Sequence, residues 1–261
     1  MPTSDGAVQV EIDVAARPST VFRCIVESGL LSQWLAANAT IDARVGGAVR
    51  IDFERHGTVV EGRVTEVVPD ERVVFTWGVA SGPDSASMPA GSTRVTISIA
   101  ATPRGARVTL RHEGLPSEAS RRDHESGWRG YVGQLAQTAP RVQRPGGFDA
   151  LVDAYLAAWA ETDAASRDAL LRESFAEGGR FVDAHADVTG RAALDTHIAA
   201  CQRMFPGVRM VRDGTVMQSQ DALLVRWRAL TASGEQAAAG INFMQLAPGG
   251  EIETVRGFWA G

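Results

Sequence analysis

The chain has 261 residues, of which 44% are hydrophobic and 22% are charged, and its formal net charge is −5. This composition is typical of a globular protein, and the length suits either one large domain or two of ordinary size. The acidic balance leaves no surplus of cations to pair with phosphates, so it excludes a general binder of nucleic acid or of anionic membranes. All 26 basic residues are arginine, a bias that we attribute to a GC-rich bacterial genome.

The two cysteines, Cys24 and Cys201, fall in different halves of the chain and form neither a disulfide framework nor a metal-binding spacing. The polar stretch from Met1 to Ala7 lacks the layout of a signal peptide, and no apolar run approaches the roughly 20 residues that cross a bilayer. The sequence also contains no phosphate loop, dinucleotide fingerprint or nucleophile elbow. We therefore expect a cytoplasmic protein with no membrane contact, no metal and no cofactor.

A segment rich in proline and glycine, residues 138–147, lies between two helical patterns. Proline removes a backbone donor and glycine adds conformational freedom, so we expect neither helix to continue through it. This predicts a first domain at 1–139, a linker at 140–147 and a second domain at 148–261.

The first half begins with strict alternation of apolar and polar residues from Val8 to Val14, which predicts a half-buried strand. A helix starts at Pro18, and a short helical piece covers 30–35. Further strands, separated by turn residues, are expected at 49–53, 58–68, 73–79, 93–100 and 106–113. A helix at about 117–139 carries an apolar stripe. A row of strands and one long terminal helix predict an antiparallel sheet curled around that helix.

The second half reverses this order. Helices are expected at 148–160, 165–175 and 191–205, the last with Leu194, Ile198, Cys201 and Phe205 on one side. A short strand at 180–183 precedes the third helix, and long strands are expected at 208–218, 222–231, 236–246 and 251–259. Helices followed by a meander of strands predict a cone. The fold class is therefore α+β, with two domains.

Residues 8 to about 136 resemble the Hsp90-ATPase-activator-like branch of the START-like, or helix-grip, superfamily. The matching motifs are PSTVF at 18–22, Trp34, RVGG at 44–47, VEGRVTEVVPDERVVFTW at 60–77, VTLRHEGL at 108–115 and HESGWRGYVGQL at 124–135. The resemblance implies a cavity between the sheet and the C-terminal helix that takes apolar ligands. It transfers no chaperone role, because nothing in this chain resembles the separate Hsp90-contacting domain of the activators, so we expect no Hsp90 contact.

Residues 148–259 resemble the SnoaL-like, ketosteroid-isomerase-like members of the NTF2 superfamily. The motifs are YLAAWAETD at 155–163, FVDAHADVTGRAAL at 181–194, FPG at 205–207 and INFMQLAPGGEIETVRGFW at 241–259. In the isomerases a strand aspartate before a proline abstracts the proton. Asp183 matches it, although Ala184 replaces the proline. Tyr155 matches the tyrosine of helix one, and Asn242 falls where the isomerases have a protonated aspartate.

These three residues suggest a proton transfer beside a carbonyl. Asp183 shares its strand face with Phe181, and an apolar cone around a carboxylate disfavours the charged form and raises its pKa towards that of a usable base. Tyr155 and Asn242 can each donate a hydrogen bond to a developing enolate oxygen. The alternative is structural, in which Asp183 caps the following loop, Tyr155 belongs to the core and Asn242 satisfies a strand edge.

Aromatic and histidine side chains complete the candidate ligand-binding residues. In each case the sequence leaves open whether the side chain lines a pocket or fills a core. His112 and His124 are expected to point inward, where they either hold a polar tip of a ligand or hydrogen-bond each other and close the core. The pair Asp183 and His185 is too small a set for a metal site. The candidates are Trp34, Phe75, Trp77, His112, His124 and Trp128 in the first half, and Trp159, His185, His197, Trp227 and Trp259 in the second.

Three functions remain open at this point. The first is a protein that binds a small apolar or polycyclic ligand and carries out cofactor-independent isomerase, cyclase or lyase chemistry at Asp183. The second is non-catalytic ligand binding or sequestration in the helix-grip cavity of the first half, or a stress- or co-chaperone-like role. It is favoured if Asp183 is paired with an arginine and the second pocket is collapsed. The third is an interaction module in which the second domain forms a homodimer, because Arg226 and Arg228 alternate with Val225 and Trp227 as on a two-faced strand.

Overall fold

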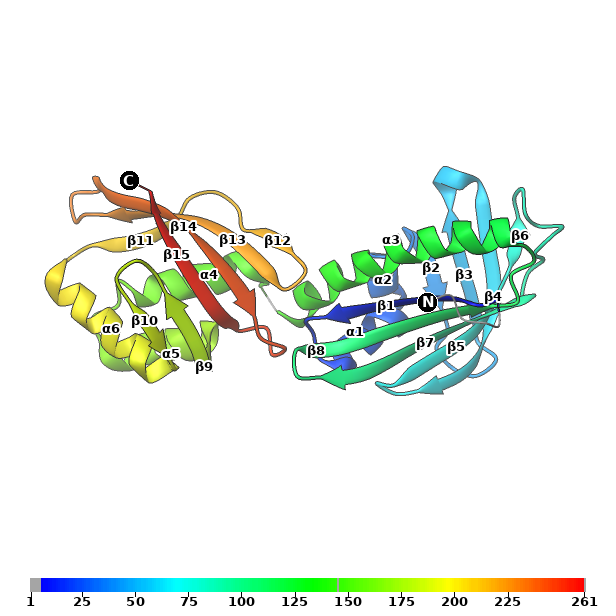
Figure 1. The fold of residues 1–261 in the computed structure, drawn as a ribbon, viewed down its shortest axis with the longest axis horizontal. Coiled ribbons are helices and arrows are strands. Elements are labelled where there is room, and N and C mark those ends of the chain that lie inside the picture. Colours follow the sequence, from blue (N-terminus) through cyan, green and yellow to red (C-terminus); the bar gives the residue numbers. More distant parts are fainter. Residues whose placement is uncertain (1–5, 145, 261) are drawn as a thin grey trace. The chain divides into compact units, whose positions relative to one another are not determined.

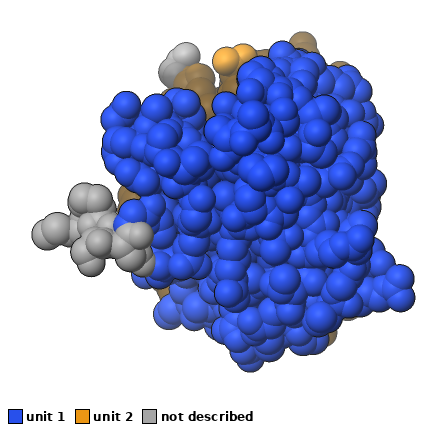
Figure 2. Space-filling view, turned by 90° about the vertical axis from the view of Figure 1, so that its right-hand side faces the viewer, with its two compact units in different colours: residues 1–143 blue, residues 144–261 orange. Residues whose placement is uncertain are grey.

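A computed structural model describes residues 6–144 and 146–260. Most of the N-terminal stretch considered above, residues 1–5, lies outside the described residues, as does residue 145 of the expected linker. The chain divides into two compact units, residues 1–143 and 144–261, which Figure 2 draws in blue and orange. The expected domains, 1–139 and 148–261, each lie within one unit. Among the described residues, no helix is both long enough and apolar enough to cross a membrane.

Unit 1 is an antiparallel sheet with one long helix and two short ones (Figure 1). The sheet order is β1-β8-β7-β5-β4-β3-β2, with β6 paired to β4. The elements are β1 (Val8–Val14), α1 (Pro18–Val26), α2 (Ser28–Leu31), β2 (Asn38–Ile41), β3 (Ala48–Phe53), the 3-10 helix η1 (Glu54–His56), β4 (Thr58–Val68), β5 (Arg72–Trp77), β6 (Val79–Ser81), β7 (Thr93–Thr102), β8 (Gly105–Glu113) and α3 (Glu118–Gln143).

Helix α3 continues through Pro140 to Gln143, beyond the end that we expected. Proline removes one N–H from the helical ladder, but in the last turn only that one bond is lost. The side chain of Gln143 fixes this turn, because its Oε1 accepts hydrogen bonds from the backbone N–H of Arg17 at 2.7 Å and from Thr20 Oγ1 at 3.2 Å. The end of α3 is therefore tied to the start of α1.

A hydrogen-bond chain through His112 closes the core of unit 1. Trp128 Nε1 donates to His112 Nδ1 at 3.1 Å, so the proton of the neutral ring lies on Nε2. His112 Nε2 in turn donates to Thr93 Oγ1 at 2.8 Å, and the Thr93 hydroxyl donates to the carbonyl of Trp77 at 2.8 Å. The ring is fully buried, and burial, helped by His124, lowers the pKa of His112 to about 3.

Unit 2 is a seven-stranded sheet with three helices on one face (Figure 1). Its order is β10-β9-β15-β14-β13-β11, with β12 paired to β13, and only the β15–β9 pair is parallel among the described strands. The elements are α4 (Gly147–Ala158), α5 (Ala164–Ser174), β9 (Phe175–Val182), β10 (Asp187–Thr189), α6 (Arg191–Met204), β11 (Arg209–Arg212), β12 (Met217–Ser219), β13 (Ala222–Leu230), β14 (Gln236–Leu246) and β15 (Ile252–Ala260).

The α+β class and the two sheet-and-helix architectures are confirmed, and several details differ from expectation. Two short strands, β2 and β10, were not expected. The single strand expected at 208–218 is two strands, β11 and β12, which pair with different parts of β13. Between them the backbone N–H of Asp213 still donates to the carbonyl of Arg226, after which the chain leaves the ladder.

The His112 chain predicts a pH-dependent stability. The folded-state pKa of about 3 lies below the ordinary 6.5, so the unfolded chain binds the proton first as the pH falls. The stabilisation is complete above pH 6.5 and is lost towards pH 3, by at most about 1.4 kcal/mol per pH unit. Urea unfolding at pH 7, 6 and 5 should show a steeper loss of stability in the wild type than in His112→Gln, which does not titrate. If the free energy of unfolding falls equally with pH in the wild type and in His112→Gln, the lowered pKa is not a property of His112.

Candidate functional site

Unit 2 contains a cavity of ≈ 490 Å³ between its helices and the concave side of its sheet. Its volume lies within the range of small-molecule sites, and its walls are mainly aromatic and aliphatic. All eight candidate residues of the second half line it. The complete lining is Tyr155, Trp159, Phe181, Asp183, His185, His197, Cys201, Gln202, Met204, Phe205, Val208, Met210, Trp227, Ala229, Asn242, Gly257 and Trp259.

Two buried donors on the α4 side of the cavity have no acceptor among the described residues, Tyr155 Oη and Trp159 Nε1. The two rings lie 6.4 Å apart at an interplanar angle of 72°. Burial raises the pKa of the Tyr155 phenol; the Trp159 indole opposes this shift and the charge of Asp183 adds to it. Tyr155 is therefore a neutral hydroxyl. A buried donor without an acceptor costs about 1–3 kcal/mol, which a ligand oxygen can recover.

Asp183 follows the last residue of β9 and holds the loop after it. Its Oδ1 accepts from the backbone N–H groups of His185 and Ala186, both at 2.8 Å, and its Oδ2 accepts from Trp259 Nε1 at 3.2 Å. The loop-capping role considered above is thus present in the structure. The same carboxylate lines the cavity together with Phe181, as their shared strand face predicted. Asp183 is half-buried, so its carboxylate is less enclosed than the apolar cone that we expected.

Asn242 and Gly257 form part of the sheet wall and pair with each other across β14 and β15. The Oδ1 of Asn242 accepts from Trp227 Nε1 at 3.1 Å, which leaves the amide N–H₂ as the free half of the side chain. Gly257 keeps the space between Asn242 and Asp183 open. A Cβ at this position would lie 3.2 Å from Asp183 Cβ and 3.3 Å from Asn242 Oδ1.

The two histidines of unit 2 occupy different places in the cavity. His197, on α6, packs against Trp159 and Phe181 with centroid distances of 5.8 Å, and its Nε2 lies 3.6 Å from Cys201 Sγ. Burial and the nearby carboxylate of Asp183 raise the pKa of Cys201, which keeps it a thiol rather than a nucleophilic thiolate. His185 is exposed and packs edge-to-face against Trp259 at 5.5 Å.

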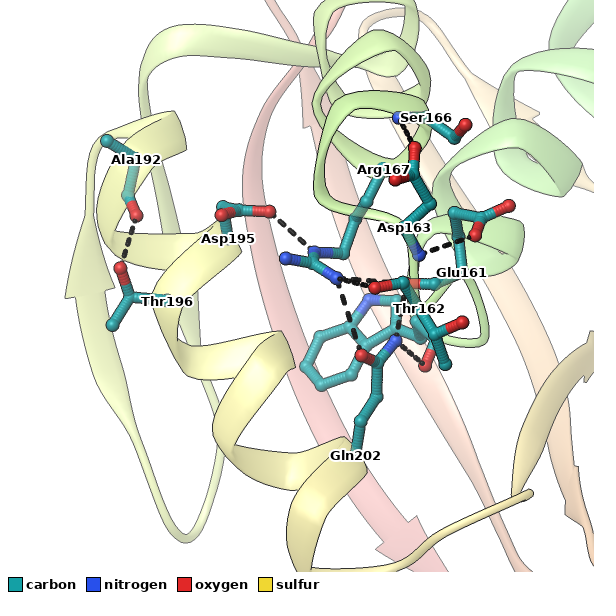
Figure 3. Close-up of polar contacts among 10 residues, drawn as sticks. Glu161, Thr162, Asp163, Ser166, Arg167, Ala192, Asp195, Thr196 and Gln202 are labelled. Carbon is teal, nitrogen blue, oxygen red and sulfur yellow. Dashed lines mark hydrogen bonds and ion pairs between the residues drawn. The ribbon is translucent and has the colours of Figure 1, made fainter.

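A polar cluster centred on Arg167 joins the end of α4 to α6 (Figure 3). Arg167 Nε donates to Asp195 Oδ1 at 2.6 Å, and its side chain is only 5% exposed. Its Nη1 also donates to the carbonyl of Glu161 at 3.0 Å and to Gln202 Oε1 at 3.4 Å. Gln202 Nε2 donates to the carbonyls of Trp159 at 3.1 Å and Glu161 at 2.8 Å. Trp159 and Gln202, which both line the cavity, are therefore held together by hydrogen bonds of this cluster.

The interior of unit 1 differs from our expectation of a hollow domain. Trp34, Phe75 and Trp128 surround a space of only ≈ 10 Å³, about the minimum for one water. Trp34 Nε1 donates to the carbonyl of Cys24 at 2.8 Å, a structural bond. At this depth the interior is therefore nearly filled, by side chains and the His112 chain. Trp77 and His124 instead line an open groove of ≈ 330 Å³ at the surface, to which Trp128 also contributes.

Several lining residues of unit 2 were not among the candidates, notably Cys201, Gln202, Met204 and Gly257. The helical stripe through Cys201 and Phe205 indicated the correct side of α6, but Phe205 is 62% exposed at the end of the helix rather than buried. Glycine has no side chain to suggest a pocket, so the sequence held no indication of the role of Gly257. Among the described residues, no group of three or more His, Cys, Asp or Glu side chains is arranged to hold a metal ion.

Comparison with known proteins finds similarity for each half. A family model for "Activator of Hsp90 ATPase homolog 1-like protein" matches residues 15–139. The search of curated proteins finds no match. Among solved structures, a SnoaL-like protein from Agrobacterium tumefaciens, provisionally named an isomerase, is 32% identical in sequence. It covers 43% of this chain and 96% of its own, with a TM-score of 0.41.

Two further solved structures are similar to this chain. A protein from Chromobacterium violaceum is 26% identical and covers 51% of this chain and 96% of its own, with a TM-score of 0.43. The Aha1 dimer from Colwellia psychrerythraea is 17% identical and covers 51% of this chain and 92% of its own, with a TM-score of 0.42. In its second half the chain belongs to the SnoaL-like family, and in its first half it matches the family model for Activator of Hsp90 ATPase homolog 1-like protein.

Proposed function

We propose that unit 2 binds a small, mostly apolar molecule with a carbonyl group and transfers a proton at the carbon next to that carbonyl. The observation that carries this proposal is the composition of one cavity. A carboxylate, Asp183, lies in the same ≈ 490 Å³ space as Tyr155 and Asn242, within walls that are otherwise largely aromatic.

The carbonyl oxygen of the ligand would accept hydrogen bonds on the Tyr155 side of the cavity. Tyr155 Oη and Trp159 Nε1 are donors without acceptors, and the amide N–H₂ of Asn242 is a third donor in the same lining. Donors fixed before the reaction stabilise the negative charge that develops on an enolate oxygen, because they need no reorganisation. The neutral Tyr155 hydroxyl, whose pKa is raised by burial, is suited to this role.

Asp183 would act as the base. It takes the proton from the carbon next to the carbonyl, the C–H electrons form the carbon–carbon double bond of the enolate, and the negative charge moves to the carbonyl oxygen. Where the ligand also carries a carbon–carbon double bond beside that carbon, the enolate is a dienolate. Return of the proton to the far carbon of the dienolate shifts the double bond, which completes an isomerisation with no net loss or gain of atoms. The three N–H groups that donate to Asp183 hold its carboxylate in one orientation, and an orientation fixed in advance favours such a transfer.

The second candidate is a binding protein without chemistry. We expected that function to coincide with an arginine paired to Asp183 and a collapsed second pocket. Neither feature is present in the described part of the chain, where the hydrogen bonds of Asp183 come from two backbone N–H groups and an indole. These observations favour the proton-transfer proposal, while the loop-capping role of Asp183 keeps binding alone as the alternative.

Replacing Asp183 by Asn should abolish proton transfer while leaving binding largely intact. The Asn Oδ1 can still accept from the backbone N–H groups of His185 and Ala186, so the loop is kept, while the base and the acceptor for Trp259 Nε1 are lost. A general base typically contributes 10²–10⁴-fold, so we expect at least a 100-fold slower exchange of the protons next to the carbonyl of 2-tetralone in D₂O, followed by proton NMR.

The matched control for this experiment is Trp259→Phe, which removes the indole N–H from Asp183 but keeps the base and an aromatic ring. Its exchange rate should fall by much less than that of Asp183→Asn. Binding of 2-tetralone, followed by quenching of tryptophan fluorescence, should be similar in the wild type and Asp183→Asn. Equal exchange rates in the wild type and Asp183→Asn would exclude Asp183 as the base.

A side chain at position 257 should fill the space in front of the sheet and keep the ligand from reaching that part of the cavity wall. The φ angle of Gly257 is outside the left-handed region, so a side chain costs little backbone strain, but its Cβ would crowd Asp183 and Asn242. We expect Gly257→Val to weaken binding of 2-tetralone at least 10-fold. Gly178→Val is the control, because a Cβ there meets open space. Similar binding by the two variants would place the ligand elsewhere.

The outer face of the same sheet supports a homodimer proposal. Side chains alternate along β14 and β15, so Ile241 and Phe258 point away from the cavity that Asn242 and Gly257 line. The two are partners in register and are 37% and 59% exposed. Exposed apolar side chains on a sheet face are typical of an interface, and a second copy offers the same surface in return.

Phe258→Arg should dissociate this dimer. The wild type is expected to sediment as two chains of 27.8 kDa and the variant as one, because a buried charge without a partner would oppose association. Phe205→Arg is the control, since Phe205 is equally exposed but lines the cavity rather than the outer face. A wild type that sediments as a monomer would rule out the dimer.

A further inference from the structure

Four aromatic side chains of unit 1 form a closed cycle at the surface groove of this unit. Adjacent ring centroids are 6.2 Å apart for Phe53 and Trp77, 5.0 Å for Trp77 and Trp128, 6.1 Å for Trp128 and Tyr131, and 5.6 Å for Tyr131 and Phe53. They come from β3, β5 and α3, which are far apart in sequence. We call these four residues the aromatic box. All four line the groove of ≈ 330 Å³.

The charged residues that line this groove are acidic. Asp84 and Asp123 both contribute to its lining, together with the histidines His56 and His124. Arginine is the basic residue of this chain, with 26 copies, and none of them lines the groove. The electrostatic potential of the groove therefore favours a cation.

Both carboxylates remain available to a ligand. The neighbouring arginines of α3 are engaged elsewhere, Arg121 and Arg122 with Glu118. Among the described residues, the side-chain carboxylates of Asp84 and Asp123 form no hydrogen bond and no ion pair; the contacts of Asp84 with Ser87 and Met88 use its backbone carbonyl. Two unpaired carboxylates beside aromatic rings leave the negative charge of the groove uncompensated.

A third feature points to an oxygen atom in the ligand. Trp77 Nε1 is a buried donor that has no acceptor in the described part of the chain, and Trp77 is only 4% exposed. The other indole of the aromatic box, Trp128, already donates to His112 at 3.1 Å. The lining of the groove thus includes one indole with an unused N–H donor, that of Trp77, together with the two carboxylates.

We propose that this groove binds an organic cation, a quaternary ammonium or a protonated amine, that also carries a hydroxyl or carbonyl oxygen. The electron-rich faces of aromatic rings attract a cation within about 6 Å of the ring centroid. Asp84 and Asp123 add long-range attraction, and the oxygen of the ligand accepts from Trp77 Nε1. A hard metal ion does not fit these groups, because it requires several oxygen ligands rather than ring faces.

This site is separate from the cavity of unit 2 and does not depend on the function proposed there. The two differ in the groups available for recognition. In unit 2 the unpaired groups are donors that suit a neutral carbonyl, whereas the groove of unit 1 combines ring faces with two free carboxylates. Loss of one activity would therefore leave the other unchanged.

The test compares choline with 3,3-dimethyl-1-butanol, which has the same shape and hydroxyl group but a carbon in place of the charged nitrogen. Binding of each to the full chain is followed by NMR titration of the tryptophan indole signals. We expect choline to bind at least 10-fold more tightly than the neutral compound. Equal binding, tighter binding of the neutral compound, or no binding of choline would overturn the proposal.

Matched variants identify the groups responsible. Tyr131→Leu should weaken choline binding several-fold and Tyr131→Phe should retain it, because only Phe keeps the ring face. The double variant Asp84→Asn, Asp123→Asn should remove most of the preference for choline. Asp70→Asn, an exposed carboxylate outside the groove, is the control and should change nothing. Choline binding that is unchanged in Tyr131→Leu and in the double variant would place the cation elsewhere.

Discussion

The carboxylate of Asp183 is the group on which the geometry of the unit 2 cavity depends. One oxygen accepts from two backbone N–H groups and so fixes the loop between β9 and β10. The other accepts from Trp259 and holds this half-exposed ring at the cavity mouth. Trp259 then packs edge-to-face against Trp227 at 5.2 Å, and Trp227 donates to Asn242. One carboxylate thus orders a loop, two rings and an amide, so the same residue can support the cavity and act within it.

Aromatic side chains that point inward lead to opposite results in the two units. In unit 1, His112 accepts from one indole and donates to Thr93, so these polar atoms satisfy each other and the space beside Trp34 and Phe75 is nearly filled. Trp77, whose Nε1 has no acceptor among the described residues, lines the open groove instead. In unit 2, the buried Arg167 and its partners tie α6 to the end of α4 from behind, while Tyr155 and Trp159 keep unused donors. A core closes where its polar groups pair internally, and a hollow persists where helices are fixed by contacts outside it.

The sequence predicted the parts of the structure that depend on periodicity. Alternation gave the bounds of β1 and β14, and the SnoaL-like motifs brought Asp183, Tyr155 and Asn242 to one cavity. Strands of three or four residues, such as β2 and β10, are too short for a period to appear. Whether inward aromatic residues enclose a cavity depends on hydrogen bonds between distant elements, such as that of Trp128 with His112. No local pattern encodes those bonds, so a filled and a hollow interior could not be told apart.

The distribution of arginine decides what both sites can accept. With 26 arginines and no lysine, every fixed positive side-chain charge of the chain is a guanidinium. Many of these guanidiniums lie in exposed ion pairs, such as Arg107 with Asp13 and Arg180 with Asp187, which contribute little to stability. None lines the cavity of unit 2 or the groove of unit 1, where the carboxylates are the charged groups. A carboxylate or phosphate ligand would meet repulsion in either place without a partner. Neutral molecules and cations are therefore the ligands that this charge pattern allows.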